Sequence, residues 1–200
     1  DHAMYENISD PDLFNVYARG MTGKIKGLIL GHFKEVDKIP QCDRYVWGID
    51  YGYTNDPTAI VKMGVIGRQR YFKEICYEPG LGAENIKRLF VMNGWDNSQP
   101  IFSEHDPEMI LQLRKLGMPI SQAKKGPGSL VAGIAKLKEW ECFYSGENFK
   151  REIENYKYIT AKDLLTGKEI LTNEPMDGMD HLCSASRYAA YTDSFLYRTG

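Results

Sequence analysis

The spacing of apolar residues divides the chain into short β-rich runs followed by alternating helical and extended segments. Residues 45–50, 58–66 and 69–77 are rich in β-branched and aromatic residues and are separated by turn residues. These runs predict a three-stranded antiparallel meander. Apolar positions three and four residues apart then predict helices at residues 83–93, 107–116, 129–137, 148–156 and 177–191. Short apolar runs at residues 100–102, 118–123 and 142–144 predict further strands, and a polar hairpin-like stretch surrounds residues 165–167.

The order of these elements indicates an α/β fold with a sheet of mixed direction. A meander that is continued by strands alternating with helices is typical of a mixed sheet, with later strands parallel and helices covering its faces. The chain has 200 residues, of which 42% are hydrophobic, so it can bury one sizeable core. We therefore expect one domain at residues 41–193 and a C-terminal tail at residues 194–200.

Residues 5–40 lack a sustained apolar period and are interpreted as an arm ahead of this domain. A short helix is expected at residues 10–19. Residues 27–33 are expected to form an edge strand or to pack on the domain, and Ile39-Pro40 marks the boundary. The first four residues, Asp-His-Ala-Met, are interpreted as a cloning remnant and are left out of the fold prediction.

Composition narrows the classes of function. The formal net charge is -2, which argues against a nucleic-acid binder that relies on overall positive charge. A net charge of -2 is still compatible with a local basic face. The four cysteines lie far apart without zinc-binding spacing and are most simply reduced core thiols of an intracellular protein. No apolar run approaches the roughly 18 residues that span a bilayer, so no membrane partner is expected.

Two acidic residues follow predicted strands. Asp50 ends the apolar run that starts at Tyr45 and precedes Gly52, and Glu104 follows the run at residues 100–102. Taken alone, Asp50 is as well explained by a turn that its side chain stabilises as by a ligand role. Carboxylates that gather from two strand ends would, however, supply the oxygen ligands that a hard divalent cation requires.

Several motifs in this order resemble the C-terminal nuclease half of tailed-phage terminase large subunits. They are Trp47-Gly-Ile-Asp-Tyr-Gly-Tyr-Thr-Asn-Asp-Pro-Thr58, Glu104-His-Asp-Pro-Glu108 with residues 113–117 following, Ala123-Lys-Lys-Gly-Pro-Gly-Ser129, and Asp180-His181 with Ala185-x-Arg-Tyr-Ala189. The resemblance covers about residues 5–192 and implies a ribonuclease H-like fold. It also implies that residues 5–40 link to an ATPase domain that would precede them in the full-length chain.

The resemblance implies a metal-dependent endonuclease that cuts concatemeric double-stranded DNA with low sequence specificity during genome packaging. In this family clustered carboxylates hold two Mg²⁺ or Mn²⁺ ions, one to activate water and one to stabilise the leaving oxygen. Asp50 would bridge both ions and Glu104 would be the ligand from the second strand. The implied partners are double-stranded DNA, the portal protein, the terminase small subunit and the ATPase domain, at the procapsid in the host cytoplasm rather than in the mature virion.

The third ligand departs from the family pattern. Many relatives carry the metal carboxylate three residues after the histidine, where this chain has Ser184. On a helix, Asp177, Asp180, Ser184 and Arg187 share one face, so a carboxylate one turn earlier is expected to reach the same ions. Asp180 is the preferred candidate, and Asp177 is either a further ligand or a helix cap.

Other residues have supporting roles in this hypothesis. His105 and His181 flank acids and are expected either to orient a ligand or only to hydrogen-bond a carboxylate. Lys124 and Lys125 open a helix after a glycine turn and are expected either to contact DNA phosphates or to form a solvated basic turn. Two alternative functions stay open: a non-catalytic or weakly active DNA-guiding domain of the motor, in which Ser184 leaves the metal site incomplete, and another ribonuclease H-type nuclease such as a resolvase.

Overall fold

The computed structural model describes residues 27–176 and 178–196, so the helix expected at residues 10–19 lies outside the described residues. The strands are β1 (Lys34–Glu35), β2 (Arg44–Asp50), β3 (Pro57–Ile66), β4 (Gln69–Pro79), β5 (Ile101–Ser103), β6 (Ile120–Gln122), β7 (Glu141–Ser145), β8 (Tyr158–Lys162) and β9 (Glu169–Pro175). The helices are α2 (Ala83–Met92), α3 (Pro107–Lys115), α4 (Ser129–Lys138), α5 (Glu147–Asn155) and α6 (His181–Leu196). Every strand and helix predicted from residue 45 onward is present.

Seven strands form one mixed sheet in the order β1-β7-β4-β3-β2-β5-β6. The antiparallel meander β2-β3-β4 occupies its centre. β5 and β6 continue the sheet in parallel beyond β2, whereas β7 and β1 continue it in parallel beyond β4. The predicted mixed α/β architecture is confirmed. Of the two alternatives for residues 27–33, packing on the domain is confirmed, because Leu30 and Phe33 are buried and the Phe33 ring stacks on Phe72, whereas the edge strand β1 starts only at Lys34.

One face of the sheet buries large side chains of β2 against α2 and α3. Trp47 and Ile49 are fully buried in a cluster with Phe90 of α2 and Leu113 of α3. The rings of Trp47 and Phe90 stack with centroids 4.5 Å apart. Because side chains alternate along a strand, the intervening residues Gly48 and Asp50 point to the opposite face.

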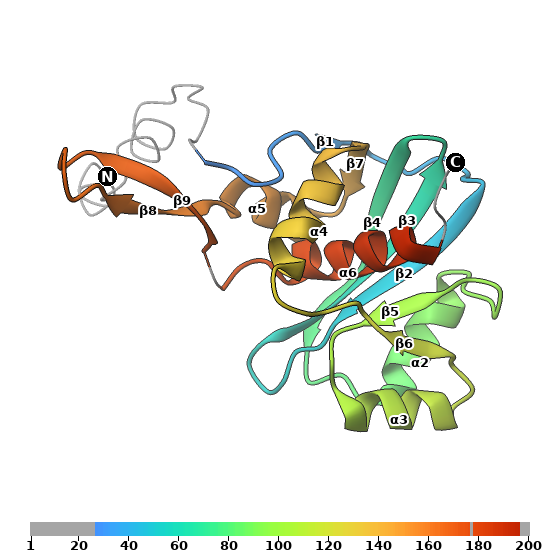
Figure 1. Ribbon diagram of the computed structural model, residues 1–200. Helices are drawn as coiled ribbons and strands as arrows, with labels where there is room; N and C mark the ends of the chain where they lie inside the picture. Colours follow the sequence, from blue (N-terminus) through green and yellow to red (C-terminus); the bar gives the residue numbers. More distant parts are fainter. Residues whose placement is uncertain (1–26, 177, 197–200) are drawn as a thin grey trace, which may run out of the picture. The chain divides into compact units, whose positions relative to one another are not determined.

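Helix α6 lies across that opposite face (Figure 1). A Cβ atom at Gly48 would lie 2.0 Å from the carbonyl oxygen of Ala185, so only glycine permits this close helix-to-strand approach. Residues 182–190 of α6 are all buried. The helix is therefore an internal element, and its position relative to β2 determines which of its residues meet the strand end.

The chain forms two compact units. The described part of the smaller unit comprises residues 27–29 and 157–176, and the larger unit contains the seven-stranded sheet. In the smaller unit β8 and β9 pair antiparallel, and the Asp163 carboxylate accepts hydrogen bonds from the amides of Leu165 and Thr166 in the turn. The hairpin-like stretch predicted around residues 165–167 is thus confirmed.

The start of the last helix was predicted wrongly. It begins at His181 instead of residue 177, and it extends to Leu196. Gly178 has a φ of 116°, which is incompatible with a right-handed helix.

All four cysteines are buried and free. No helix among the described residues is long and apolar enough to cross a membrane.

Candidate active site

Asp50 and Glu104 emerge side by side from the ends of two parallel strands. Ile49 of β2 is in register with Ser103 of β5, and the Glu104 amide donates to the Ile49 carbonyl at 2.9 Å. Asp50 is the last residue of β2 and Glu104 the first after β5. Because parallel neighbours end at the same edge of a sheet, both carboxylates lie at this edge, as the sequence predicted.

Helix α6 brings His181 to this edge by running antiparallel to β2. His181 Nδ1 lies 3.0 Å from Asp50 Oδ2 at one end, and Asp193 accepts two hydrogen bonds from Arg44 at 2.8 and 2.6 Å at the other. Along the helix, the twelve residue steps from His181 to Asp193 rise about 18 Å. Along the strand, the six residue steps from Arg44 to Asp50 span about 20 Å. These two lengths match, so the Arg44–Asp193 pair and the close contact at Gly48 set the register that places His181 on Asp50.

Asp180 lies just before α6 instead of inside it. Its carbonyl oxygen accepts the first helical hydrogen bond, from the Ser184 amide at 2.6 Å, and Ser184 Oγ donates to its Oδ2 at 3.1 Å. The prediction that Asp180 shares a helix face with Ser184 and Arg187 is therefore wrong, because the helix starts at His181. Asp177 itself lies outside the described residues. The Ser184 hydroxyl holds the Asp180 carboxylate, and Arg187 in turn reaches Ser184 Oγ at 3.4 Å.

Burial and charge repulsion alter the proton affinity of Asp50. Only 7% of the residue is exposed, and its pKa is raised to about 6. Burial is the largest cause of the rise, the charges of Glu104 and Asp180 add to it, and the hydrogen bond from His181 opposes it. The same hydrogen bond raises the pKa of His181 against the effect of its own burial. Asp50 therefore lies beside two acids that disfavour its ionised form, and a bound cation would offset this repulsion.

Of the two predicted phosphate-contacting lysines, one reaches the acids. Lys125 Nζ lies 2.9 Å from Glu104 Oε1, whereas Lys124 is directed elsewhere, with its Nζ 3.5 Å from the centre of the Phe195 ring. His105 is exposed in the loop after β5. The neighbouring Asp106 caps α3 by accepting a hydrogen bond from the Met109 amide at 3.0 Å.

One residue behind the site was missed by the sequence analysis. Glu152 of α5 is 1% exposed, and its Oε2 accepts a hydrogen bond from the Cys183 amide at 2.9 Å, in the first turn of α6. It thus satisfies an amide at the helix start that carries His181. The available signal was an acid at position 152 between Phe149 and Ile153, on the apolar face of a predicted helix.

The donor chemistry of this edge fits a divalent metal ion, although the ligands are not gathered around one point. Among the described residues there is no group of three His, Cys, Asp or Glu side chains placed to hold one ion. Asp50 and Glu104 nevertheless offer hard carboxylate oxygens from rigid strand ends, and Asp180 lies close enough to raise the pKa of Asp50. Lys125 and His181 supply the positive or proton-donating partners of these oxygens.

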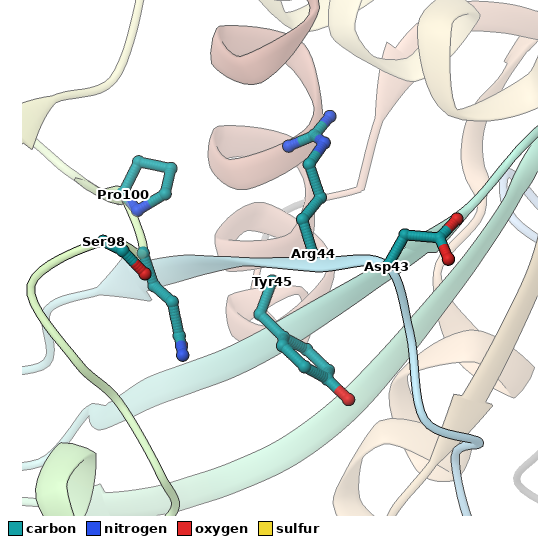
Figure 2. A pocket seen from close by; sticks show the side chains of 6 residues that line it. Asp43, Arg44, Tyr45, Ser98 and Pro100 are labelled. Carbon is teal, nitrogen blue, oxygen red and sulfur yellow. The ribbon is translucent and has the colours of Figure 1, made fainter.

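A small hollow of about 260 Å³ lies away from this edge. Its lining residues are Asp43, Arg44, Tyr45, Ser98, Gln99 and Pro100 (Figure 2). Arg44 begins β2 and Asp50 ends it, so the hollow is at the opposite end of the strand from the acids. The hollow is thus not part of the candidate site.

Comparisons with known proteins point to one family. No protein-family model matches the chain. The large terminase subunit of Bacillus phage SPP1 is 27% identical over 164 residues, which cover 78% of this chain and 38% of that protein. The chain thus spans well under half the length of this curated relative.

Solved structures give the same picture for the fold. The nuclease domain of the SPP1 large terminase, crystallised with bound Mn, has a TM-score of 0.66 and 24% identity over 82% of this chain and 98% of that one. The P22 large terminase nuclease domain has a TM-score of 0.58 and 18% identity over 85% and 93%. The thermophilic phage G20c large terminase nuclease with bound magnesium has a TM-score of 0.59 and 10% identity over 84% and 98%. The chain is therefore similar in sequence to a phage terminase large subunit and has the ribonuclease H-like fold of large-terminase nuclease domains, which confirms the resemblance carried by its motifs.

Proposed function

We propose that this domain is a divalent-metal-dependent endonuclease that cuts concatemeric double-stranded DNA with low sequence specificity during phage genome packaging. The observation that carries the proposal is the pairing of Asp50 and Glu104 at the ends of adjacent parallel strands, with Asp180 close enough to raise the pKa of Asp50. The similar domains of SPP1 and G20c were crystallised with Mn and magnesium. We propose that this chain also binds a divalent metal ion.

Asp50, Glu104 and Asp180 would hold two Mg²⁺ or Mn²⁺ ions. When bound, such ions would lower the pKa of an attacking water and stabilise charge on the phosphate oxygens. The protein's own contribution is positioning. His181 holds one oxygen of Asp50, Ser184 holds one oxygen of Asp180, and Lys125 lies where an anionic phosphate can meet its ammonium group.

The function of the complete motor belongs to the same proposal. The partners would be an ATPase domain in the same full-length chain, the portal protein and the terminase small subunit. The place of action would be the procapsid in the host cytoplasm. Because the net charge of this chain is -2, we assign the grip on DNA during packaging to the other parts of the motor.

The test is cleavage of supercoiled plasmid in Mn²⁺, in Mg²⁺ and in EDTA. The parent protein should nick and linearise the plasmid with either metal and be inactive in EDTA. Asp50→Ala and Asp180→Ala should lower the rate by at least about a hundredfold, since each removes an anionic ligand. Glu84→Gln, which neutralises an exposed acid in α2, is the matched control. Cleavage that persists in EDTA or survives Asp50→Ala would end the metal-dependent assignment.

One observation favours a second function. The described residues lack a preformed group of three metal-ligating side chains, and Ser184 occupies the position at which the family resemblance implies a helix acid. These features suit a DNA-guiding domain that binds the duplex without cutting it. Such a domain would retain DNA binding in both metals and in EDTA and would leave the plasmid intact. A resolvase-like enzyme would instead prefer branched junctions over linear duplex.

A further inference from the structure

Lys125 is held inside the candidate site by contacts on both sides. Its Nζ lies 2.9 Å from Glu104 Oε1 and 4.9 Å from the centre of the Tyr188 ring on α6. About one third of each charged side chain is exposed, 34% for Lys125 and 33% for Glu104. The ammonium group is therefore partly desolvated between a carboxylate and an aromatic face, which is a stronger position than that of a surface lysine.

The loop that carries Lys125 is anchored independently of this ion pair. The Ala123 amide donates to the Ser103 carbonyl at 2.8 Å and so continues the ladder between β5 and β6. The Lys124 amide donates to Thr192 Oγ1 on α6 at 3.0 Å. These two bonds fix the backbone of the two residues that precede Lys125, independently of its ion pair with Glu104.

We infer that Lys125 is a built-in competitor for the divalent cation at Glu104, which metal binding must displace and which DNA phosphate then accepts. This inference rests on the proposed metal-dependent function. An ammonium group and a divalent ion repel each other, and both need the oxygens of the same carboxylate. An anion such as a backbone phosphate gives the ammonium group a second charged acceptor, to which it can move when it leaves Glu104.

The exchange makes metal binding and DNA binding support each other. Without DNA, the lysine stays on Glu104 and lowers the affinity for the ion. With DNA, the phosphate takes the lysine and Glu104 is released to the ion, so each ligand raises the affinity for the other by the same factor. The site would thus load its metal fully only when a substrate is present.

The test is calorimetric titration of Mn²⁺ into the DNA-free protein, which involves no turnover. Lys125→Met should bind Mn²⁺ about fivefold more tightly than the parent, the scale on which a partly exposed ion pair contributes. Lys124→Met changes the net charge equally but removes an ammonium that lies on Phe195, and it should leave the affinity within about twofold. Lys125→Arg keeps the charge and should bind Mn²⁺ like the parent.

A double-mutant comparison identifies the carboxylate involved. In a Glu104→Gln background, Lys125→Met should no longer increase the Mn²⁺ affinity, because residue 104 then carries no carboxylate for which the ammonium group and the ion compete. A Lys125→Met protein that binds Mn²⁺ no more tightly than Lys124→Met would overturn the inference, as would equal tightening by Lys125→Arg. If neither the parent nor Lys125→Met binds Mn²⁺, the proposed function itself fails. If Mn²⁺ binds and Glu104→Gln weakens it while Lys125→Met does not tighten it, only the role of Lys125 fails.

Discussion

At the scale of single residues, the ionised carboxylate of Asp50 lowers the stability of the folded protein. Asp50 is almost completely buried, and burial raises its pKa to about 6 from 3.8. A carboxyl group whose pKa is higher in the folded state than in the unfolded chain binds protons more tightly when folded. Its contribution to stability is therefore lost as the pH rises from about 4 to about 6, and its ionised form is a cost at neutral pH that a bound cation would offset.

Asp50→Asn should stabilise the metal-free protein while abolishing cleavage. The asparagine keeps the shape of the side chain and removes the buried charge, so the unfolding free energy at pH 7.5 should rise by about 1–3 kcal/mol, as judged from a shift of about two pH units. Urea denaturation measures this change, with the exposed turn substitution Asp56→Asn as control. Mn²⁺ should raise the melting temperature of the parent and have little effect on the variant. A destabilised Asp50→Asn would mean that the His181 hydrogen bond outweighs the burial of charge.

At the scale of elements, the strands were predictable and the last helix was predictable only in part. Apolar runs bounded by turn residues placed β2 to β7 within about two residues of their observed limits, because burial of a strand leaves a local pattern. Helix α6 is buried on nearly all sides. The spacing of its apolar residues therefore indicates neither which face is buried nor the residue at which the helix begins. Asp50 and Glu104 were found because strand ends are local features. The contact of Lys125 with Glu104 was not, because it depends on the register between a loop and a distant strand.

Glu152 links two helices and has its own pH dependence. Burial is the largest influence on its pKa and raises it, while the amides of Cys183 and Leu182 lower it less. Ionised Glu152 therefore costs stability above the pKa of the unfolded chain. The parent should lose stability relative to Glu152→Gln as the pH rises from 4.5 to 8, measured by urea denaturation at both values. Glu154→Gln, an exposed acid of the same helix, should show no such trend. A difference that is constant with pH would show that helix capping dominates over burial.

At the scale of the whole molecule, charge is nearly balanced while the proposed substrate is a polyanion. The chain has 25 Lys and Arg residues against 27 Asp and Glu residues, and the acids at the sheet edge repel phosphate until cations are present. A few lysines beside the site must then provide the contacts that this fragment makes with DNA. Those contacts are electrostatic and release counterions, so their strength depends steeply on salt.

The isolated fragment should therefore bind duplex DNA weakly, with a Kd of about 1 μM or weaker at physiological salt. Fluorescence anisotropy with a 30-base-pair duplex in EDTA, at salt concentrations from 50 to 200 mM, measures both the affinity and its salt dependence. Replacing Lys125 with Met should lower the slope of log K against log salt by about one, because one phosphate contact is lost. Lys150→Met removes an ammonium that pairs with Glu35 on the far strand β1 and should leave the slope unchanged. Nanomolar binding at physiological salt would instead place a complete DNA grip within this domain and remove the need for the rest of the motor to supply it.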